Sequence, residues 1–147
     1  MLLTVSCGRQ SITDSAEELC KHVPNPECLE LSNGYLTEDF YSVIEKMVTL
    51  PEPTPVLHEW EFWFVAADGS AISGDTCKIL EIEKTDSTHA KVLVRVQPED
   101  TDYEKEDHTL YMEKVNGKWL LADYDGRKAD AIRYIAGKLH WQPTQVL

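Results

Sequence analysis

The stretch that decides the fold class is Asn116-Gly117-Lys118-Trp119-Leu120-Leu121-Ala122-Asp123-Tyr124-Asp125-Gly126-Arg127-Lys128. Asn-Gly between two runs of strand-forming residues is the strongest short-range signal for a β-hairpin. It predicts a turn at residues 116–117 and a strand that runs from there through Tyr124. The apolar residues that follow recur at helical spacing, which predicts a closing helix with one apolar face: Ala129, Ile132, Ile135, Ala136 and Leu139.

Upstream of this segment the hydrophobic period is two, as in half-buried strands. Strands are predicted over residues 58–65, 77–84, 90–96 and 108–115. With the strand after Asn116-Gly117 they make five. Residues 98–107 form an acidic connection that we expect to be a solvated loop.

Two helices are predicted before the strands. The first covers residues 11–23, with Ser15 and Glu18 as a possible capping box. The second opens with Thr37 as N-cap. Its apolar stripe consists of Phe40, Val43, Ile44, Met47 and Val48.

Helices first, then a meander of strands, then one helix indicate an α+β fold, with helices packed on a curved antiparallel sheet of about five strands. No linker divides the chain of 147 residues, so residues 12–147 are expected to form a single domain. The formal net charge of −12 argues against nucleic-acid binding, which needs a basic surface. No apolar run reaches the roughly 18 residues of a membrane helix.

The first eight residues, MLLTVSCG, resemble the end of a bacterial lipoprotein signal, although a basic region and most of the apolar core are missing. Residues 1–11 are therefore expected to be a truncated signal end and tether, with Cys7 as the lipid anchor. The protein would be exported to the periplasm or the outer surface and touch the membrane only through that anchor. The alternative is an ordinary apolar N-terminus.

The three other cysteines fit no zinc-binding spacing. Cys20 and Cys28 bracket a short Pro-containing loop, so a disulfide between them is a candidate in an oxidising compartment. The alternative is two independent buried thiols. Cys77 opens a predicted strand and is expected to be a small core residue.

Three segments resemble a family of small, often exported bacterial proteins of unknown function, common in Bacteroides-like bacteria: GYLTEDFYSVIEK, EWEFWFVAADG and KVNGKWLLADYDGRKADAIRYI. The resemblance covers roughly residues 12–140. It implies the conical α+β fold shared by cystatin-like and nuclear-transport-factor-2-like proteins, with a possible cavity at the open end of the cone. The resembled family has no assigned catalytic residues, so the resemblance implies none for this sequence.

Enzymes with related cone folds place a carboxylate or an imidazole in the cavity as acid or base. Strand alternation puts His108 on the face of Leu110, and Asp123 on the face of Trp119 and Leu121, so both are weak catalytic candidates. They would serve an isomerase, dehydratase or hydrolase-like reaction. The simpler reading is that both lie at strand ends, where polar residues meet water.

The aromatic row of the sheet is expected to be core, and it could also line a ligand cavity: Trp60, Phe62, Phe64, Trp119 and Leu121. No nucleotide-binding glycine motif occurs, and no cofactor is predicted.

Charged residues surround the start of the last helix. Asp125 is expected to accept hydrogen bonds from the first free amides of the helix. Arg127 and Lys128 would either pair with Asp123, Asp125 or Asp130, or hold an anionic group. The Asp-Tyr-Asp-Gly run lacks the other ligands of a calcium loop, so no metal is predicted.

These observations favour a non-enzymatic, lipid-anchored binding module of the cell envelope that takes a small ligand or a protein partner. The alternative is a small cone-fold enzyme that uses Asp123 and His108. A homodimer through the outer sheet face, at Leu93 and Trp63, is a further expectation.

Overall fold

The computed structural model describes residues 11–21, 34–50, 76–97 and 104–139. These residues form three helices and four strands, which makes the described part of the chain an α+β structure as predicted. In chain order the elements are α1 (Ile12–Lys21), α2 (Glu38–Val48), β1 (Thr76–Lys84), β2 (His89–Gln97), β3 (Glu106–Val115), β4 (Lys118–Tyr124) and α4 (Lys128–Leu139). The predicted strand over residues 58–65 lies outside the described residues.

The four strands form an antiparallel sheet in the order β1-β2-β3-β4, a simple meander. The segment before α2 adds to the free side of β4. Thr37 N–H donates to the Leu121 carbonyl at 3.0 Å, and Leu121 N–H donates to the Tyr35 carbonyl at 2.8 Å. This parallel bridge fixes the start of α2 against the sheet.

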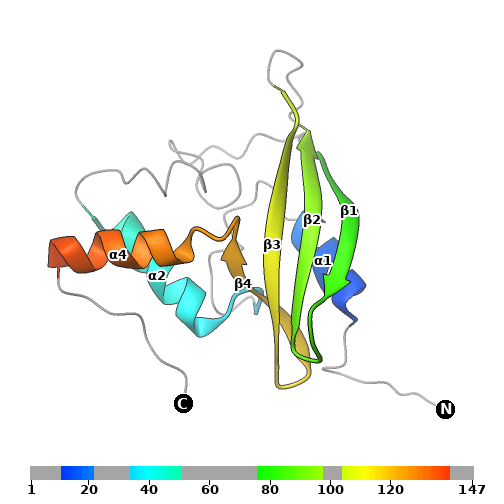
Figure 1. Cartoon of the computed structure of the whole chain (residues 1–147), viewed down its shortest axis with the longest axis horizontal. Coiled ribbons are helices and arrows are strands. Elements are labelled where there is room, and N and C mark those ends of the chain that lie inside the picture. The colour runs from blue at the N-terminus through cyan, green and yellow to red at the C-terminus, as the bar shows by residue number, and fades with distance from the viewer. Residues whose placement is uncertain (1–10, 22–33, 51–75, 98–103, 140–147) are drawn as a thin grey trace.

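The core lies on one face of the sheet. Alternate residues of β2, β3 and β4 point to this inner face and are buried, and the helices contribute the remaining apolar side chains. Helix α1 packs against β1 and β4, whereas α2 packs against β4 and α4. Figure 1 shows α2 and α4 side by side beyond β4, and α1 behind β1 and β2.

Local sequence signals explain where the described elements begin and turn. The Thr37 side chain accepts a hydrogen bond from Phe40 N–H at 3.2 Å, which confirms it as the N-cap of α2. Asn116 and Gly117 have φ angles of 52° and 81°, the left-handed values that a two-residue hairpin turn requires.

Two details of the predicted helices are wrong. Ser11, not Ser15, caps α1, since its hydroxyl accepts from Asp14 N–H at 3.0 Å; Ser15 lies inside the helix and is buried. In α4 the buried residues are Ala131 and Ile135, while Ala129 is exposed. The helix begins at Lys128, and its packing on α2 selects the face that carries Ala131.

Candidate functional site

His108 and Asp125 form the shortest described contact between a histidine and a carboxylate. The Nδ1 atom of His108 lies 2.6 Å from Oδ2 of Asp125, while Oδ1 of Asp125 accepts from Thr109 N–H at 2.7 Å. Asp125 N–H in turn donates to the Thr109 carbonyl at 2.8 Å. One aspartate therefore continues the strand pairing and holds the imidazole at the same time. The predicted inward position of His108 is confirmed, because it is buried on the face of Leu110.

The partner of His108 differs from the predicted one because β4 contains a bulge. Met112 pairs with Leu121, but Tyr111 pairs with Asp123, so β4 carries one extra residue, Ala122. An extra residue reverses the in-and-out alternation of everything after it. Asp123 consequently leaves the face of Trp119 and Leu121. The predicted placement of Asp123 on the same face as His108 is therefore wrong.

Asp123 instead holds the start of α4. Its Oδ1 atom accepts from Lys128 N–H at 3.0 Å and from Tyr124 N–H at 2.7 Å. This is the capping role that the sequence predicted for Asp125. Burial raises the pKa of Asp123 above its ordinary value, and the two backbone hydrogen bonds only partly oppose that rise.

The environment of His108 combines burial with negative charge. Its ring stacks on Tyr124 with ring centroids 5.0 Å apart, and its Nε2 atom lies 3.2 Å from Oε2 of Glu106 without the geometry of a hydrogen bond. Burial lowers the pKa of His108, but the hydrogen bond and charge of Asp125 and the charge of Glu106 outweigh it, so the pKa is raised. Protonation of His108 thus converts its contact with Asp125 into a half-buried ion pair.

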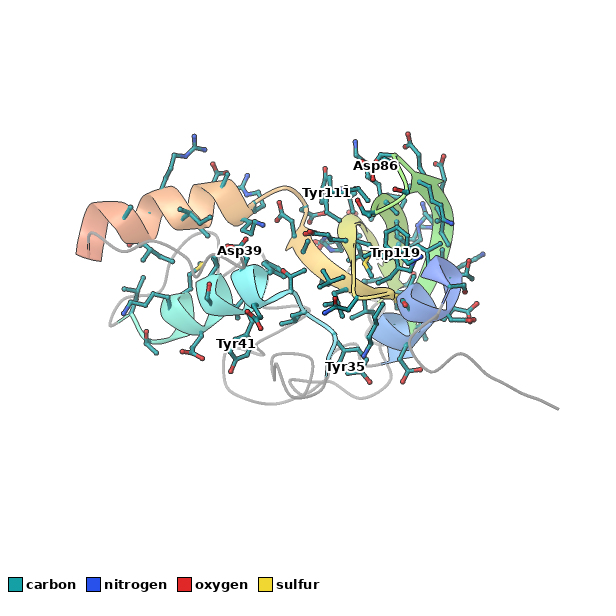
Figure 2. The ribbon with its side chains drawn as sticks, turned by 90° about the horizontal axis from the view of Figure 1, so that it is seen from below. Tyr35, Asp39, Tyr41, Asp86, Tyr111 and Trp119 are labelled. Atoms are coloured by element: carbon teal, nitrogen blue, oxygen red, sulfur yellow. A yellow bond between two sulfur atoms is a disulfide. The ribbon has the colours of Figure 1, made fainter. Side chains whose placement is uncertain are left out.

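Arg127 and Lys128 are both engaged by carboxylates. The Nζ atom of Lys128 lies 2.7 Å from Oδ2 of Asp39, and Nε of Arg127 lies 3.6 Å from Oδ2 of Asp130. Figure 2 shows Asp39 on α2, on the side that faces α4. Asp39 is 89 residues away from Lys128 in sequence, so the sequence pattern, which points to the neighbouring acids, does not predict this ion pair. This arrangement leaves the helix start poorly suited to hold a separate anion.

The disulfide of the described residues joins Cys20 to Cys77, with their Cα atoms 5.2 Å apart. Both alternatives considered for Cys20 are therefore wrong: it is not bonded to Cys28, and it is not a free thiol. Cys77 is correspondingly a bridge residue rather than a plain core residue. The physical reason is the packing of α1 on β1, which brings together two cysteines 57 residues apart. Cys28 itself lies outside the described residues.

A cavity of about 220 Å³ lies where α1 meets the segment before α2 and the start of β4. Its lining combines apolar, aromatic and charged residues: Ser15, Glu18, Leu19, Gly34, Tyr35, Lys118 and Trp119. Figure 2 shows Trp119 close to α1, with Tyr35 near the same end of the molecule. A second, more open cavity of about 400 Å³ lies beside the disulfide.

Two residues of the smaller cavity carry polar groups that make no bond to the described part of the chain. The Ser15 hydroxyl is buried, with 5% of the residue exposed, and it has no hydrogen-bond partner there. Leaving such a group unsatisfied costs about 1–3 kcal/mol. The Lys118 ammonium makes no hydrogen bond or ion pair with any residue of the described ranges. Gly34 provides space for it, because a Cβ atom there would come within 2.7 Å of Nζ, and the φ angle of 73° also favours glycine.

The predicted catalytic, cavity-lining and lipid-anchor residues thus separate into three groups. Trp119 and Leu121 are buried as expected, and Trp119 also lines the smaller cavity. His108 and Asp123 line neither of the two cavities. The remaining ones lie outside the described residues: Cys7, Trp60, Phe62 and Phe64.

Sequence reasoning missed Ser15 and Lys118. Ser15 had a detectable signal, because it interrupts the apolar face of α1 between Ile12 and Leu19, both of which are buried. A polar residue on an apolar helix face points to a buried hydroxyl that needs a partner. Lys118 carried no signal, since a lysine after a hairpin turn is usually a solvated residue.

Comparison with protein families, characterised proteins and solved structures finds no match for this chain. In the described ranges, no group of three or more histidine, cysteine, aspartate or glutamate residues is placed to hold a metal ion. No helix within those ranges is long and apolar enough to cross a membrane.

Proposed function

We propose that this protein is a non-enzymatic binding module of the bacterial cell envelope, exported and lipid-anchored through Cys7. It binds a small ligand in the cavity between α1 and β4. The observation that carries the proposal is the buried hydroxyl of Ser15, a residue of the cavity lining; it has no hydrogen-bond partner among the described residues. Native structures satisfy nearly all buried polar groups, so an unsatisfied hydroxyl beside a cavity supports a bound ligand as its partner.

Two further points support the proposal. Ligand pockets combine an apolar lining with a few polar groups, which describes this cavity. The Cys20–Cys77 disulfide is typical of proteins that reside in oxidising compartments such as the cell envelope. In the proposed architecture, residues 58–65 supply the fifth strand and the sheet curves into the cystatin-like cone of the resembled family.

The alternative is a small cone-fold enzyme, and one observation favours it. A histidine whose Nδ1 is held by a carboxylate has the orientation used in general acid–base catalysis. In such an enzyme the acidic partner would be Asp125 rather than Asp123. The binding module is preferred because His108 is 8% exposed and lines neither described cavity, so a substrate has no described route to its Nε2 atom.

The cavity proposal is tested by filling the cavity. Ser15→Met extends a side chain into the space, whereas Thr13→Met adds the same side chain to an exposed position of the same helix. We expect small-molecule ligands from a thermal-shift panel to raise the Tm of the wild type and of Thr13→Met, but not of Ser15→Met. Equal ligand-induced shifts in Ser15→Met would place binding elsewhere.

A further inference from the structure

The cavity between α1 and β4 contains a positively charged group, the Lys118 ammonium, that no residue of the described ranges neutralises. Lys118 lines it, and the Nζ atom of Lys118 has no carboxylate partner in the described ranges, although the chain carries 26 acidic against 14 basic residues. By contrast, the ammonium of Lys128 and the guanidinium of Arg95 are both paired with aspartates. Lys118 is half-buried, so its charge acts on the cavity with less screening than a fully exposed lysine.

A second cation, the Lys84 ammonium, lies near the ring of Trp119. The Nζ atom of Lys84 lies 5.9 Å from the ring centroid of Trp119, which belongs to the core and also lines the cavity. The Ser15 hydroxyl adds a hydrogen-bond donor that has no acceptor among the described residues. Oxygen atoms of an anionic group would satisfy both a hydroxyl donor and an ammonium.

Other features determine what kind of anion fits. Glu18 also lines the cavity, and its Oε1 atom accepts from the Tyr35 hydroxyl at 3.4 Å. Its charge and the net charge of −12 repel a bare inorganic anion. The ligand must therefore gain much of its affinity from the apolar wall of Leu19 and Trp119. A volume of about 220 Å³ is below the range of drug-sized pockets, which limits the ligand to a small molecule.

We propose, on the basis of the cavity function above, that the ligand is a small organic carboxylate with an apolar body. The carboxylate oxygens accept from the Lys118 ammonium and from the Ser15 hydroxyl, which must turn toward the cavity because its oxygen is enclosed by protein. The apolar body lies against Trp119 and Leu19. The site selects against neutral and cationic molecules of the same shape, because only an anion compensates the ammonium of Lys118.

Three probes of nearly equal shape test the ligand class: phenylacetate, phenylacetamide and phenethylamine. Binding to the full chain is followed by ¹H–¹⁵N NMR at the backbone amides of Ser15, Tyr35 and Trp119. We expect phenylacetate to shift these signals and to bind at least ten-fold more tightly than the amide, with the amine weakest. Inorganic phosphate should not compete at equal ionic strength.

Substitutions of lysine test whether the Lys118 ammonium causes the preference for a carboxylate. Lys118→Met keeps most of the apolar stem and removes the ammonium, and it should weaken phenylacetate binding at least ten-fold while leaving phenylacetamide binding unchanged. Lys118→Arg should retain most of the preference for the carboxylate. Lys91→Met is the matched control, since Lys91 lies over Tyr111 in β3, outside the residues that line the cavity. It should bind phenylacetate as the wild type does.

The possible failures are distinguishable. If the amide or the amine binds as tightly as the carboxylate at the same amides, the ligand class is wrong while the cavity remains a binding site. If none of the three probes shifts Ser15, Tyr35 or Trp119, the cavity function is overturned together with the ligand class. Equal losses in Lys118→Met and Lys91→Met would attribute the effect to overall charge and would also overturn the proposal.

Discussion

The imidazole of His108 in β3 is held by Asp125, which lies just after β4, with 2.6 Å between Nδ1 and Oδ2. Asp125 has a φ angle of 55°, in the left-handed region that Asn and Asp tolerate better than other non-glycine residues. The same carboxylate binds Thr109 N–H, so it ties the end of β4 to β3 at the point where the chain turns into α4. This contact gives the first two predictions.

Asp125→Asn should destabilise the protein by about 1.5–3 kcal/mol, the usual worth of a hydrogen bond to a charged group. Asparagine retains both the tolerance for a left-handed backbone and an acceptor for Thr109 N–H, so the change isolates the contact with His108. Urea unfolding near pH 6 measures the loss. Asp107→Asn is the control, because the carboxylate of Asp107 pairs with Arg95 at the surface, and it should cost less. Equal losses of unfolding free energy in Asp125→Asn and Asp107→Asn would mean that burial does not strengthen the contact between His108 and Asp125.

The free energy of unfolding should depend on pH through His108. Its folded-state pKa lies above the ordinary value of 6.5, so its stabilising contribution is complete below about pH 6.5 and is lost as the pH rises through the folded pKa. Wild type and His108→Gln should therefore differ in stability more at pH 6 than at pH 9. NMR titration of the His108 ring gives the pKa directly, and a value below 6.5 would contradict the prediction.

Two substitutions separate the charge of Asp123 from its hydrogen bonds. Asp123→Ala removes the acceptor of Lys128 N–H and should cost about 0.5–2 kcal/mol, as for the loss of a helix cap. Asp123→Asn keeps an acceptor and loses the charge whose burial raises the pKa, so it should be close to neutral at pH 7. Since the folded-state pKa of Asp123 is raised, its contribution is complete below pH 3.8 and declines as pH rises through the folded pKa. Equal losses for the two variants near pH 7 would show that the charge itself matters.

Peptide mapping without reduction should identify the Cys20–Cys77 bond. Trypsin cleaves after Arg9, Lys21, Lys46 and Lys78, so the expected product links peptide 10–21 to peptide 47–78. A link between 10–21 and 22–46 would instead show pairing with Cys28.

Reduction of this bond should lower the free energy of unfolding by about 4 kcal/mol, because the bridge closes a loop of 57 residues in the unfolded chain. Urea unfolding with and without dithiothreitol measures the difference. The variant Cys20→Ser/Cys77→Ser should match the reduced wild type and should not respond to the reductant.

Local signals of the sequence were sufficient to place the described elements. The Asn116-Gly117 turn, the Thr37 cap and the alternation of β2 and β3 depend on neighbouring residues only, and the described structure has each of them where predicted. The α+β class followed from the order of these elements. Even the inward orientation of His108 was predictable, since no irregularity separates it from Leu110 in β3.

Contacts between distant residues were decided by the tertiary structure alone. One extra residue, Ala122, exchanged the expected roles of Asp123 and Asp125, because a bulge depends on how β4 pairs with β3 and leaves no mark in the composition of the strand. The Cys20–Cys77 bond and the Lys128–Asp39 pair span 57 and 89 residues, and they form because helix packing brings their elements together. The cavity has the same origin: Ser15 and Lys118 line one cavity because α1 packs against β4.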